Sequence, residues 1–388
     1  MAAEKKQILT VKNIRNVNME NILRSMLQNR NVTRSVLAKE NHISLMTVKH
    51  IVDNLLSAGI IEERESVSGD VGRNPKTLEI SERYGNVVCV NLTSREEIRF
   101  LIYDIYRNLI TEQSIARQKE ETYEKELRTA AAEMKAKLSQ TAGDLVGVAI
   151  SVPGAYDESR DLVNYDLIPE LKGLHIRALF EELLRIKNIW VLHDVYAAAR
   201  AEYDSLTPKP ESQFYFYCGY GVGGFFIHQD TAVAGSQRMA GEVGKMLVPA
   251  GEEASGYTIL ENVVSVPSMK KRMKERGMAG RFAEVPDRYL AGDPQAAELL
   301  DPALDTMSLV LYNLLWIYNP SRIVVDSCSR EYAELIAAHA ERFMKGRQDE
   351  AIPVRTEICC AGSDEYRRMY GCFRMARDAW IEELASAL

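Results

Sequence analysis

The chain lacks the features that mark membrane, secreted and fibrous proteins. No apolar run approaches the roughly 18 uncharged residues that a membrane helix needs. The charged start of the chain, with Glu4, Lys5 and Lys6, is followed by no apolar signal region. We therefore expect a cytoplasmic protein. Its 388 residues, 46% of them hydrophobic and 27% charged, allow two or three hydrophobic cores.

Cysteine is scarce, and the six cysteines show no pairing pattern. They form no Cys-x-x-Cys pair and have no regular spacing, which argues against a disulfide framework and against a zinc site. We expect the thiols to be reduced and mostly structural, and no metal to bind. The cysteines are Cys89, Cys218, Cys328, Cys359, Cys360 and Cys372.

Charge is divided unevenly along the chain, whose net charge is −7. Residues 1–80 contain 12 Lys or Arg and 9 Asp or Glu, a balance of +3, so the remainder is strongly acidic. A mildly basic end on an acidic protein fits a small nucleic-acid-binding module joined to a larger domain that does not touch nucleic acid.

The first eighty residues have the pattern of three short helices followed by a hairpin. Met19–Leu27 has apolar residues on one helical face, with Asn18 available as its N-cap. Thr33 can cap a second helix that ends near Asn41, and Ser44 can cap a third. Two short β-branched segments around a Gly-, Ser- and Asn-rich stretch predict a wing after the third helix.

The third helix presents two different faces. Apolar residues recur at i, i+3, i+4 and i+7 from Val48 to Leu55 and must face the other helices, so polar and basic residues occupy the opposite face. This arrangement places side chains in a DNA major groove, and the wing tip offers an arginine for phosphate or the minor groove. The alternative is a protein-interaction module with a merely solvated face. The predicted DNA-binding residues are Arg34, Ser44, Met46, Thr47, Lys49, His50 and Arg73.

From Val87 onward, the pattern changes to strands and helices that alternate along the chain. The predicted fold class is therefore α/β, with more than one sheet. We expect strands at Val87–Val90, Ile98–Ile105, Leu109–Ile115, Leu145–Val152, Ile189–Leu192 and Phe214–Cys218, and helices at Thr122–Leu138, Ile176–Arg185, Val195–Glu202 and Asp305–Tyr318.

Four loops at predicted strand ends are rich in glycine or polar residues, and ligands of open α/β sheets bind at such ends. Each alone is weak, because a glycine cluster after a strand is as often a tight hairpin as a phosphate cradle. The loops are Val152–Asp157 (Val-Pro-Gly-Ala-Tyr-Asp), His193-Asp194, Gly219–Gly224 (Gly-Tyr-Gly-Val-Gly-Gly) and Ala240–Lys245 (Ala-Gly-Glu-Val-Gly-Lys). As an ordered set they resemble the ROK family of bacterial sugar kinases and related sugar-sensing repressors.

The resemblance covers nearly the whole chain, including the winged-helix extension that the repressor branch carries. It implies a two-lobed, actin-like (ribonuclease H-like) sugar-kinase fold with a sugar site. Asp194 matches the family's catalytic base, although His193 replaces the usual Asn, and Glu242 matches a Glu that binds sugar hydroxyls. A structural ion pair or helix cap is the alternative for both carboxylates. The predicted ligand-binding residues are Gly154, Asp166, His193, Asp194, Glu242, Lys245 and Glu261.

Three phosphate-binding elements of the family's kinases are altered here. The first phosphate loop, Asp-x-Gly-Gly-Thr in the family, reads Asn-Leu-Thr-Ser-Arg at Asn91–Arg95. Tyr220 replaces a Thr in the second loop, and Asp326-Ser327 replaces a glycine pair near the adenosine. Because phosphoryl transfer depends on positioning and neutralising the triphosphate, we expect no kinase activity, no cofactor and only a vestigial base position at Asp194.

The family's zinc site is also absent from the sequence. Lys245 stands where the family has a histidine ligand, and Gly251–Leu260 contains no cysteine. An ammonium at this position could favour a phosphorylated or acidic sugar. Alternatively, Lys245 could pair with Glu242 or another local carboxylate as a structural tie.

These observations predict a DNA-binding transcriptional regulator, a repressor by its branch, whose degenerate kinase domain binds a sugar or sugar derivative. The alternatives are a sugar kinase with an atypical nucleotide site and a DNA-binding protein whose larger domain only dimerises. The expected partners are operator DNA, a sugar or sugar phosphate, and further copies of the chain as a dimer or tetramer. We expect the winged helix at 1–80, the first lobe at 81–200, and the second at 201–388 with a C-terminal helix that could return to the first lobe.

Overall fold

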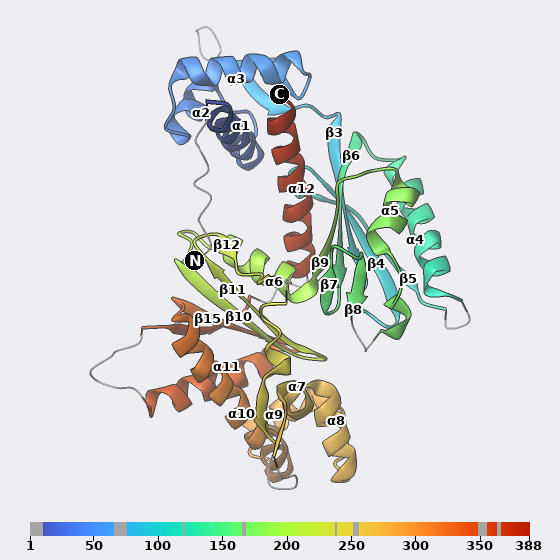
Figure 1. Ribbon diagram of the computed structural model, residues 1–388, viewed down its shortest axis with the longest axis vertical. Helices are drawn as coiled ribbons and strands as arrows, with labels where there is room; N and C mark the ends of the chain where they lie inside the picture. The colour runs from blue at the N-terminus through green and yellow to red at the C-terminus, as the bar shows by residue number, and fades with distance from the viewer. Residues whose placement is uncertain are drawn as a thin grey trace. The chain divides into compact units, whose positions relative to one another are not determined.

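The computed structural model describes residues 11–65, 76–118, 121–164, 168–236, 239–250, 256–347, 355–362 and 366–388. The chain divides into two compact units (Figure 1). Unit 1 comprises Met1–Leu192 and Cys372–Leu388, and unit 2 comprises His193–Gly371, so the boundary precedes His193 rather than following residue 200. No helix among the described residues combines the length and apolarity that spanning a bilayer requires.

The first part of unit 1 consists of three helices and a β-hairpin, the architecture of a winged helix (Figure 1). Thr33 and Ser44 are the N-caps of the second and third helices, as the sequence predicts, and accept hydrogen bonds from Val36 N–H and Thr47 N–H. The elements are α1 (Val11–Gln28), α2 (Arg34–Glu40), α3 (Leu45–Ser57), β1 (Ile61–Glu65) and β2 (Lys76–Ile80), with β1 and β2 antiparallel.

The first helix is longer than the sequence pattern predicts. It begins at Val11 and runs through Asn18, so the prediction of an N-cap at Asn18 is wrong. The segment before Met19 contains neither Gly nor Pro, and nothing in it stops helix propagation. The apolar side chains in this segment, Ile14 and Val17, are exposed, so apolar periodicity did not reveal the first part of the helix.

The rest of unit 1 is a five-stranded sheet with helices on both faces. The strand order is β5-β4-β3-β6-β9, and the helices α4 and α5 cover one face while the second part of α12 covers the other (Figure 1). On the α12 face, the rings of Tyr103 and Phe373 lie 5.4 Å apart, and those of Tyr84 and Trp380 lie 5.6 Å apart. The elements are β3 (Tyr84–Asn91), β4 (Glu97–Asp104), β5 (Leu109–Ala116), α4 (Tyr123–Leu138), β6 (Asp144–Val152), β7 (Ala155–Asp157), β8 (Leu162–Asn164), η1 (Pro169–Leu171), α5 (Ile176–Leu184), β9 (Ile189–His193) and α12 (Arg367–Ala387).

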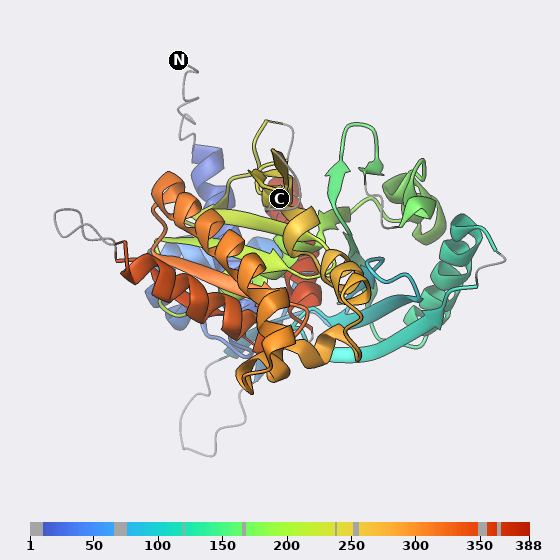
Figure 2. The same cartoon turned by 90° about the horizontal axis from the view of Figure 1, so that it is seen from below.

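Unit 2 repeats the same sheet plan with its own helices. Its strand order is β12-β11-β10-β15-β16. The helix α6 packs on one face of this sheet. The helices α10 and α11 lie side by side and pack in the core on the other face (Figure 2). The elements are α6 (Asp194–Asp204), β10 (Ser212–Cys218), β11 (Val222–His228), β12 (Thr231–Ala232), η2 (Val243–Lys245), β13 (Leu247–Pro249), β14 (Tyr257–Ile259), α7 (Leu260–Val264), α8 (Val266–Glu275), η3 (Phe282–Glu284), α9 (Val285–Leu290), α10 (Pro294–Tyr318), β15 (Arg322–Ser327), α11 (Arg330–Lys345) and β16 (Glu357–Cys360).

Both large sheets therefore follow one topology. In each, the third, second, first, fourth and fifth strands lie in that order, with antiparallel pairing among the first three. The fourth strand pairs parallel with the first, as β6 does with β3 and β15 with β10. This duplicated α/β plan is the actin-like fold, and it confirms the predicted fold class.

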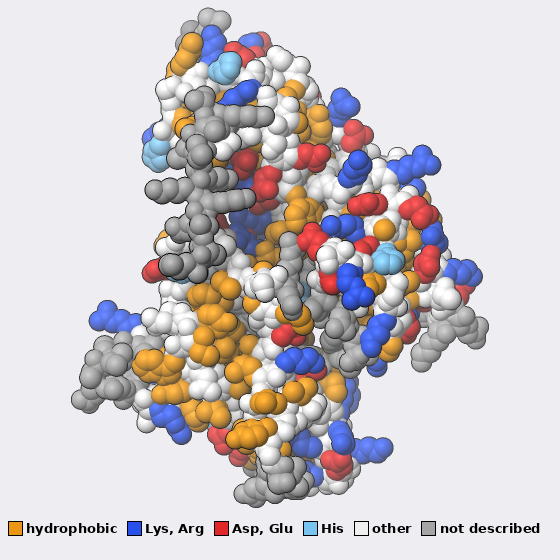
Figure 3. Space-filling model, viewed as in Figure 1, with side chains coloured by type: hydrophobic (Ala, Val, Ile, Leu, Met, Phe, Trp, Pro, Cys, Tyr) orange, Lys and Arg blue, Asp and Glu red, His pale blue; other side chains and the backbone are white. Residues whose placement is uncertain are grey.

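The two units differ in surface chemistry on the face seen in Figure 3. Charged side chains of both signs cover the region of α4 and α5, whereas hydrophobic side chains gather over unit 2. The large hydrophobic side chains that unit 2 exposes include Leu290, Trp316 and Ile317. Exposed apolar surface of this kind marks candidate contact sites for other molecules.

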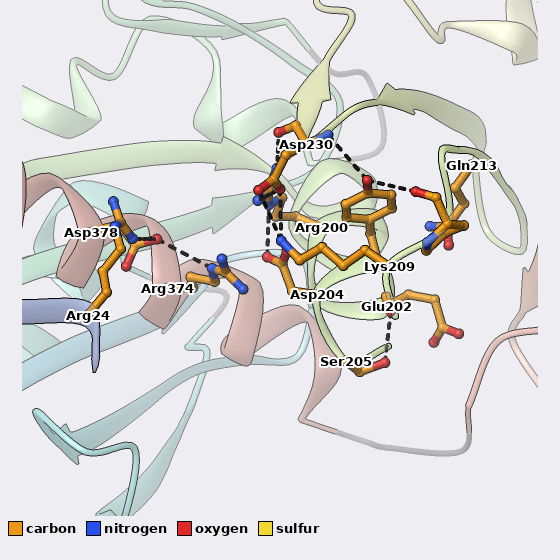
Figure 4. A network of polar contacts seen from close by, with 12 residues as sticks. Arg24, Arg200, Glu202, Asp204, Ser205, Lys209, Gln213, Asp230, Arg374 and Asp378 are labelled. Atoms are coloured by element: carbon orange, nitrogen blue, oxygen red, sulfur yellow. Dashed lines mark hydrogen bonds and ion pairs between the residues drawn. The ribbon is translucent and has the colours of Figure 1, made fainter. Parts of the chain in front are cut away.

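Within unit 1, Asp378 of α12 joins the winged helix to the sheet. Its carboxylate lies 2.6 Å from an Nη of Arg24 on α1, 3.3 Å from Nε of Arg374 and 3.4 Å from an Nη of Arg377 (Figure 4). Burial raises the pKa of Asp378, but the three guanidinium groups outweigh it and hold this pKa below its usual range. The carboxylate is therefore ionised and ties α1 to α12.

Replacing Asp378 by Asn should lower the free energy of unfolding by about 2–3 kcal/mol at pH 7, because it removes the carboxylate that Arg24, Arg374 and Arg377 share. A carboxyl whose pKa is depressed by folding stabilises the protein above its unfolded pKa of about 3.9, and this contribution disappears as the pH falls through the folded pKa. Urea unfolding of Asp378→Asn and the parent should therefore converge in acid.

The matched control is Asp144→Asn. Asp144 lies 3.5 Å from Arg83, but both side chains are 71% exposed, so its loss should change stability by less than about 0.5 kcal/mol. The assigned role of Asp378 would be contradicted if both substitutions lowered the free energy of unfolding equally. It would also be contradicted if the loss of stability in Asp378→Asn stayed the same in acid.

Candidate functional site

The strand end at β9 places His193 and Asp194 at the N-terminus of α6. The N–H of Val195 donates to His193 Nδ1 at 3.1 Å and to Asp194 Oδ1 at 2.9 Å. Because Nδ1 of His193 accepts this hydrogen bond, the proton of the neutral imidazole belongs on Nε2. Nε2 lies 3.7 Å from Glu242 Oε1. His193 thus stands between the two carboxylates that the sequence singles out.

The helix that carries Asp194 is held by a compact network of charges. Arg200 pairs with Asp204 at 2.8 Å and also with Asp230, and Lys209 lies 3.0 Å from both carboxylates (Figure 4). These contacts join α6 to the turn between β11 and β12. They fix the position of α6, and therefore of the carboxylate at its first residue.

Arg368, in the first turn of α12, is a site residue that the sequence did not reveal. One of its Nη atoms lies 3.7 Å from Asp194 Oδ2, and its guanidinium carbon lies 4.9 Å from the ring centre of Tyr217. Burial lowers the pKa of Arg368, but Tyr217, Asp194 and Asp326 together raise it above its usual value. Burial also raises the pKa of Tyr217 to about 12, so the phenol stays neutral at pH 7.

The loops at Gly219–Gly224 and Ala240–Lys245 meet backbone to backbone. Gly224 N–H donates to Gly241 O at 2.8 Å, and Gly241 has φ of +95°. A Cβ on Gly241 would lie 1.8 Å from Gly224 O. Only glycine fits here, and this contact sets the position of Glu242, the next residue.

Substituting Gly241 by Ala should lower the free energy of unfolding by about 3 kcal/mol, since it combines left-handed strain with a backbone clash. Gly292→Ala is the control, because Gly292 has φ of +80° with nothing within 4 Å of a Cβ. That change should cost only about 1 kcal/mol of strain. Chemical denaturation of both variants measures the difference, and equal losses would refute the proposed packing.

Lys245 and Glu261 lie in the same unit as the His193 cluster. Lys245 is exposed and forms no ion pair with a carboxylate among the described residues, so Glu242 is not its partner. Glu261 Oε2 accepts a hydrogen bond from Val222 N–H at 3.2 Å and thereby fastens α7 to the second glycine loop. Contact of either residue with a sugar stays a prediction.

The remaining predicted ligand residues belong to unit 1. Gly154 follows β6 with φ of +73°, a backbone conformation that favours glycine. Asp166 lies outside the described residues. Its predicted role, like that of Gly154, stays a prediction.

The segments that sequence analysis compared with kinase phosphate loops have side chains that contact other residues. Asn91 Oδ1 accepts hydrogen bonds from the N–H and hydroxyl of Thr93, which closes a tight turn. Lys270 Nζ donates to the Tyr220 hydroxyl at 3.2 Å. Asp326 Oδ2 accepts from the Tyr215 hydroxyl at 2.6 Å.

The N-terminal half of α3 is the candidate nucleic-acid interface. Met46 is 75% exposed, and Lys49 and His50 are exposed on the same helix. The Ser44 hydroxyl caps the helix and is hydrogen-bonded to the Thr47 hydroxyl at 2.8 Å. An accessible helix start with these residues can enter a major groove.

Arg34 has a different environment from the rest of this group. Its guanidinium lies 2.7 Å from Glu63 on β1 and 3.8 Å from Asp53 on α3. It thus holds α2 against α3 and the wing strand, and a DNA contact by Arg34 stays a prediction. Arg73, the predicted wing-tip contact, lies outside the described residues.

The chain belongs to the ROK family, whose model matches residues 88–379. Two solved structures of the family share the fold of this chain. A ROK family transcriptional regulator, described as a homologue of the E. coli MLC protein, superposes with a TM-score of 0.77 at 16% identity and covers 96% of this chain and 98% of that one. A ROK family glucokinase from Streptomyces griseus gives a TM-score of 0.59 at 16% identity. The match covers 76% of this chain and 99% of the glucokinase chain.

Two of the curated relatives are named as transcriptional regulators. The chain is 23% identical to the xylose repressor of Staphylococcus xylosus over 80% of this chain and 82% of that protein. It is 20% identical to the E. coli regulator NagC over 97% of this chain and 96% of that protein. These matches confirm the family resemblance drawn from the loops.

Proposed function

We propose that this protein is a sugar-responsive transcriptional regulator that binds operator DNA through its winged helix. The observation that carries the proposal is the exposed N-terminal half of α3, with Met46, Lys49 and His50 on a three-helix unit joined to the ROK domain. The glucokinase covers 76% of this chain whereas the regulator covers 96%, which supports a regulatory role for the additional part.

The proposed effector is a sugar held by Asp194 and Glu242 in unit 2. Two carboxylates around one imidazole can accept hydrogen bonds from neighbouring sugar hydroxyls, while His193 Nε2–H can donate one. A ligand regulates DNA binding only as far as it prefers one conformation of the protein. We therefore propose that sugar binding shifts the protein between a DNA-binding and a released conformation.

We further propose that phosphoryl transfer is lost. A kinase needs groups that hold a triphosphate and its metal in line with the sugar hydroxyl. Here Asn91 closes its own loop through Thr93, and Asp326 adds negative charge at a strand end where the family has glycine. Asp194, the position of the family's base, lies 3.7 Å from the Arg368 guanidinium.

The protein is proposed to act as a homo-oligomer. Helix-turn-helix modules read two half-sites through two-fold symmetry, and one winged helix alone offers few contacts. The apolar surface exposed by unit 2 supports this assignment. Light scattering after size-exclusion chromatography should give a dimer or tetramer, and a monomer at micromolar concentration would contradict it.

The test of the proposed function is a titration of the full chain with DNA from its own promoter at fixed salt, with and without a panel of sugars and sugar phosphates. Fixed salt matters because phosphate contacts make the affinity steeply salt-dependent. A several-fold change in affinity with one sugar supports the proposal and identifies the effector. DNA binding that no sugar alters contradicts the effector part, and absence of DNA binding contradicts the regulator.

A further inference from the structure

The first turn of α3 exposes two adjacent apolar side chains. Leu45 is 55% exposed and Met46 is 75% exposed. The other apolar face of the helix, from Val48 to Leu55, is buried against α2 and β1. Leu45 and Met46 therefore take no part in the core of the winged helix. They are apolar surface at the end of the helix that the proposed function places at DNA.

The side chains beside this apolar pair suit an anionic partner. Lys49 and His50 follow Met46 at i+3 and i+4, so the three side chains lie on one face of α3, and all three are exposed. Leu45 is one turn before Lys49 and borders the same face. The ammonium of Lys49 can contact a phosphate or the acceptors of a guanine. The face thus fits a surface that is anionic and also offers apolar groups.

The first turn has little capacity for hydrogen bonds to bases. The Ser44 hydroxyl accepts a hydrogen bond from Thr47 N–H at 3.1 Å, and the two hydroxyls are hydrogen-bonded to each other at 2.8 Å. Residues 44–50 contain no Arg, Asn, Gln, Asp or Glu, the side chains that most often identify guanine, adenine or cytosine. Any base readout by Leu45 and Met46 is therefore apolar.

The major groove offers one apolar group to such side chains. Among the base edges there, only thymine carries a methyl group, at C5, whereas the other groups are hydrogen-bond donors and acceptors. Burying a methyl group against an apolar side chain is favourable, and the unbranched methionine side chain adapts its shape to its partner. An apolar helix start therefore distinguishes thymine from the other bases.

We propose that Leu45 and Met46 are specificity-determining residues that contact thymine methyl groups in the operator. This inference rests on the proposed binding of operator DNA through α3. The first turn of α3 selects sites with thymine at the positions that it faces. Lys49, one turn further along the helix, adds affinity through a phosphate or guanine and does not contribute to this selection.

Uracil-substituted DNA tests the proposal, because uracil keeps every hydrogen-bonding group of thymine but lacks its C5 methyl. Fluorescence anisotropy at fixed salt compares the affinity of the full chain for promoter DNA made with thymine and for the same DNA made with uracil throughout. The parent should bind the uracil DNA about fourfold more weakly for each methyl contact that is lost.

The double variant Leu45→Ala/Met46→Ala should bind thymine DNA more weakly and distinguish the two DNAs by less than about twofold. Both side chains are exposed and alanine favours helix, so the winged helix should keep its fold, which thermal unfolding checks. Lys49→Gln should weaken binding to both DNAs and retain the thymine preference. Val17→Ala removes exposed apolar surface from α1 and should leave both affinities unchanged.

The outcomes separate this inference from the proposed function. Equal affinity of the parent for both DNAs overturns the inference and leaves DNA binding intact. A thymine preference that persists in the double variant also overturns it, because the methyl groups then act through the shape of the DNA. Absence of binding to either DNA contradicts the proposed function, and the inference with it.

Discussion

Replacing Lys49 by Glu is expected to weaken binding to promoter DNA by roughly 10- to 100-fold at fixed salt. Lys49 is exposed on α3, next to His50 and one turn from Met46. A lysine contact to a base edge or phosphate contributes about 1–3 kcal/mol, and a carboxylate in its place adds repulsion from the DNA backbone. Fluorescence anisotropy with labelled promoter DNA measures the change.

The charge-matched control is Lys135→Glu on α4, where the side chain is also exposed. It changes the net charge by the same amount but lies outside the winged helix, so its effect should be less than about threefold. The slope of log affinity against log salt should fall by about 1 for Lys49→Glu if the lysine contacts a phosphate. Equal losses in both variants would assign the effect to net charge and remove Lys49 from the interface.

The winged helix was predictable because its signals are local. The apolar spacing from Val48 to Leu55 and the cap at Ser44 both depend on residues within one helix, and the structure has them as expected. The start of α1 was not predictable in this way, since Ile14 and Val17 are exposed and polar residues separate them. Periodicity detects a buried face and gives no signal where a helix extends into solvent.

The environment of Arg34 illustrates a second limit. Arg34 is among the DNA-binding residues predicted from the sequence. In the structure it pairs with Glu63 on β1 and Asp53 on α3, which approach it only after the hairpin folds back on the helices. Charge pairing between elements depends on tertiary packing, and no spacing rule within α2 reports it.

The candidate sugar site was likewise predictable only where its residues lie in recognisable local motifs. Strand-end loops singled out His193, Asp194 and Glu242, and the structure brings these three side chains together. Arg368 was missed because it lies far along the chain, in the first turn of the C-terminal helix, and belongs to no glycine-rich loop. The sequence offers only an Arg-Arg pair at the start of an amphipathic helix, which is more often solvated than part of a ligand site.

Asp194→Asn is expected to weaken sugar binding by roughly 10- to 100-fold, while DNA binding without sugar stays within about twofold of the parent. A hydrogen bond to a charged group contributes about 1.5–3 kcal/mol, and Asn retains the shape of Asp but not its charge. Asn also keeps a side-chain oxygen that can accept the hydrogen bond from Val195 N–H, so α6 should keep its start. The measurement is the sugar concentration that gives half of the change in DNA affinity.

The control Asp144→Asn removes an exposed carboxylate of β6 and should leave the sugar response unchanged. Thermal unfolding of the variant without sugar separates loss of sugar binding from loss of structure. We expect the fold to be retained, because Arg368 keeps its contact with the Tyr217 ring when the charge of Asp194 is removed. If Asp194→Asn folds like the parent and responds to sugar at the same concentration, Asp194 serves only to accept the hydrogen bond from Val195 N–H at the start of α6. If the response is lost while folding and DNA binding persist, the carboxylate at the strand end binds the effector.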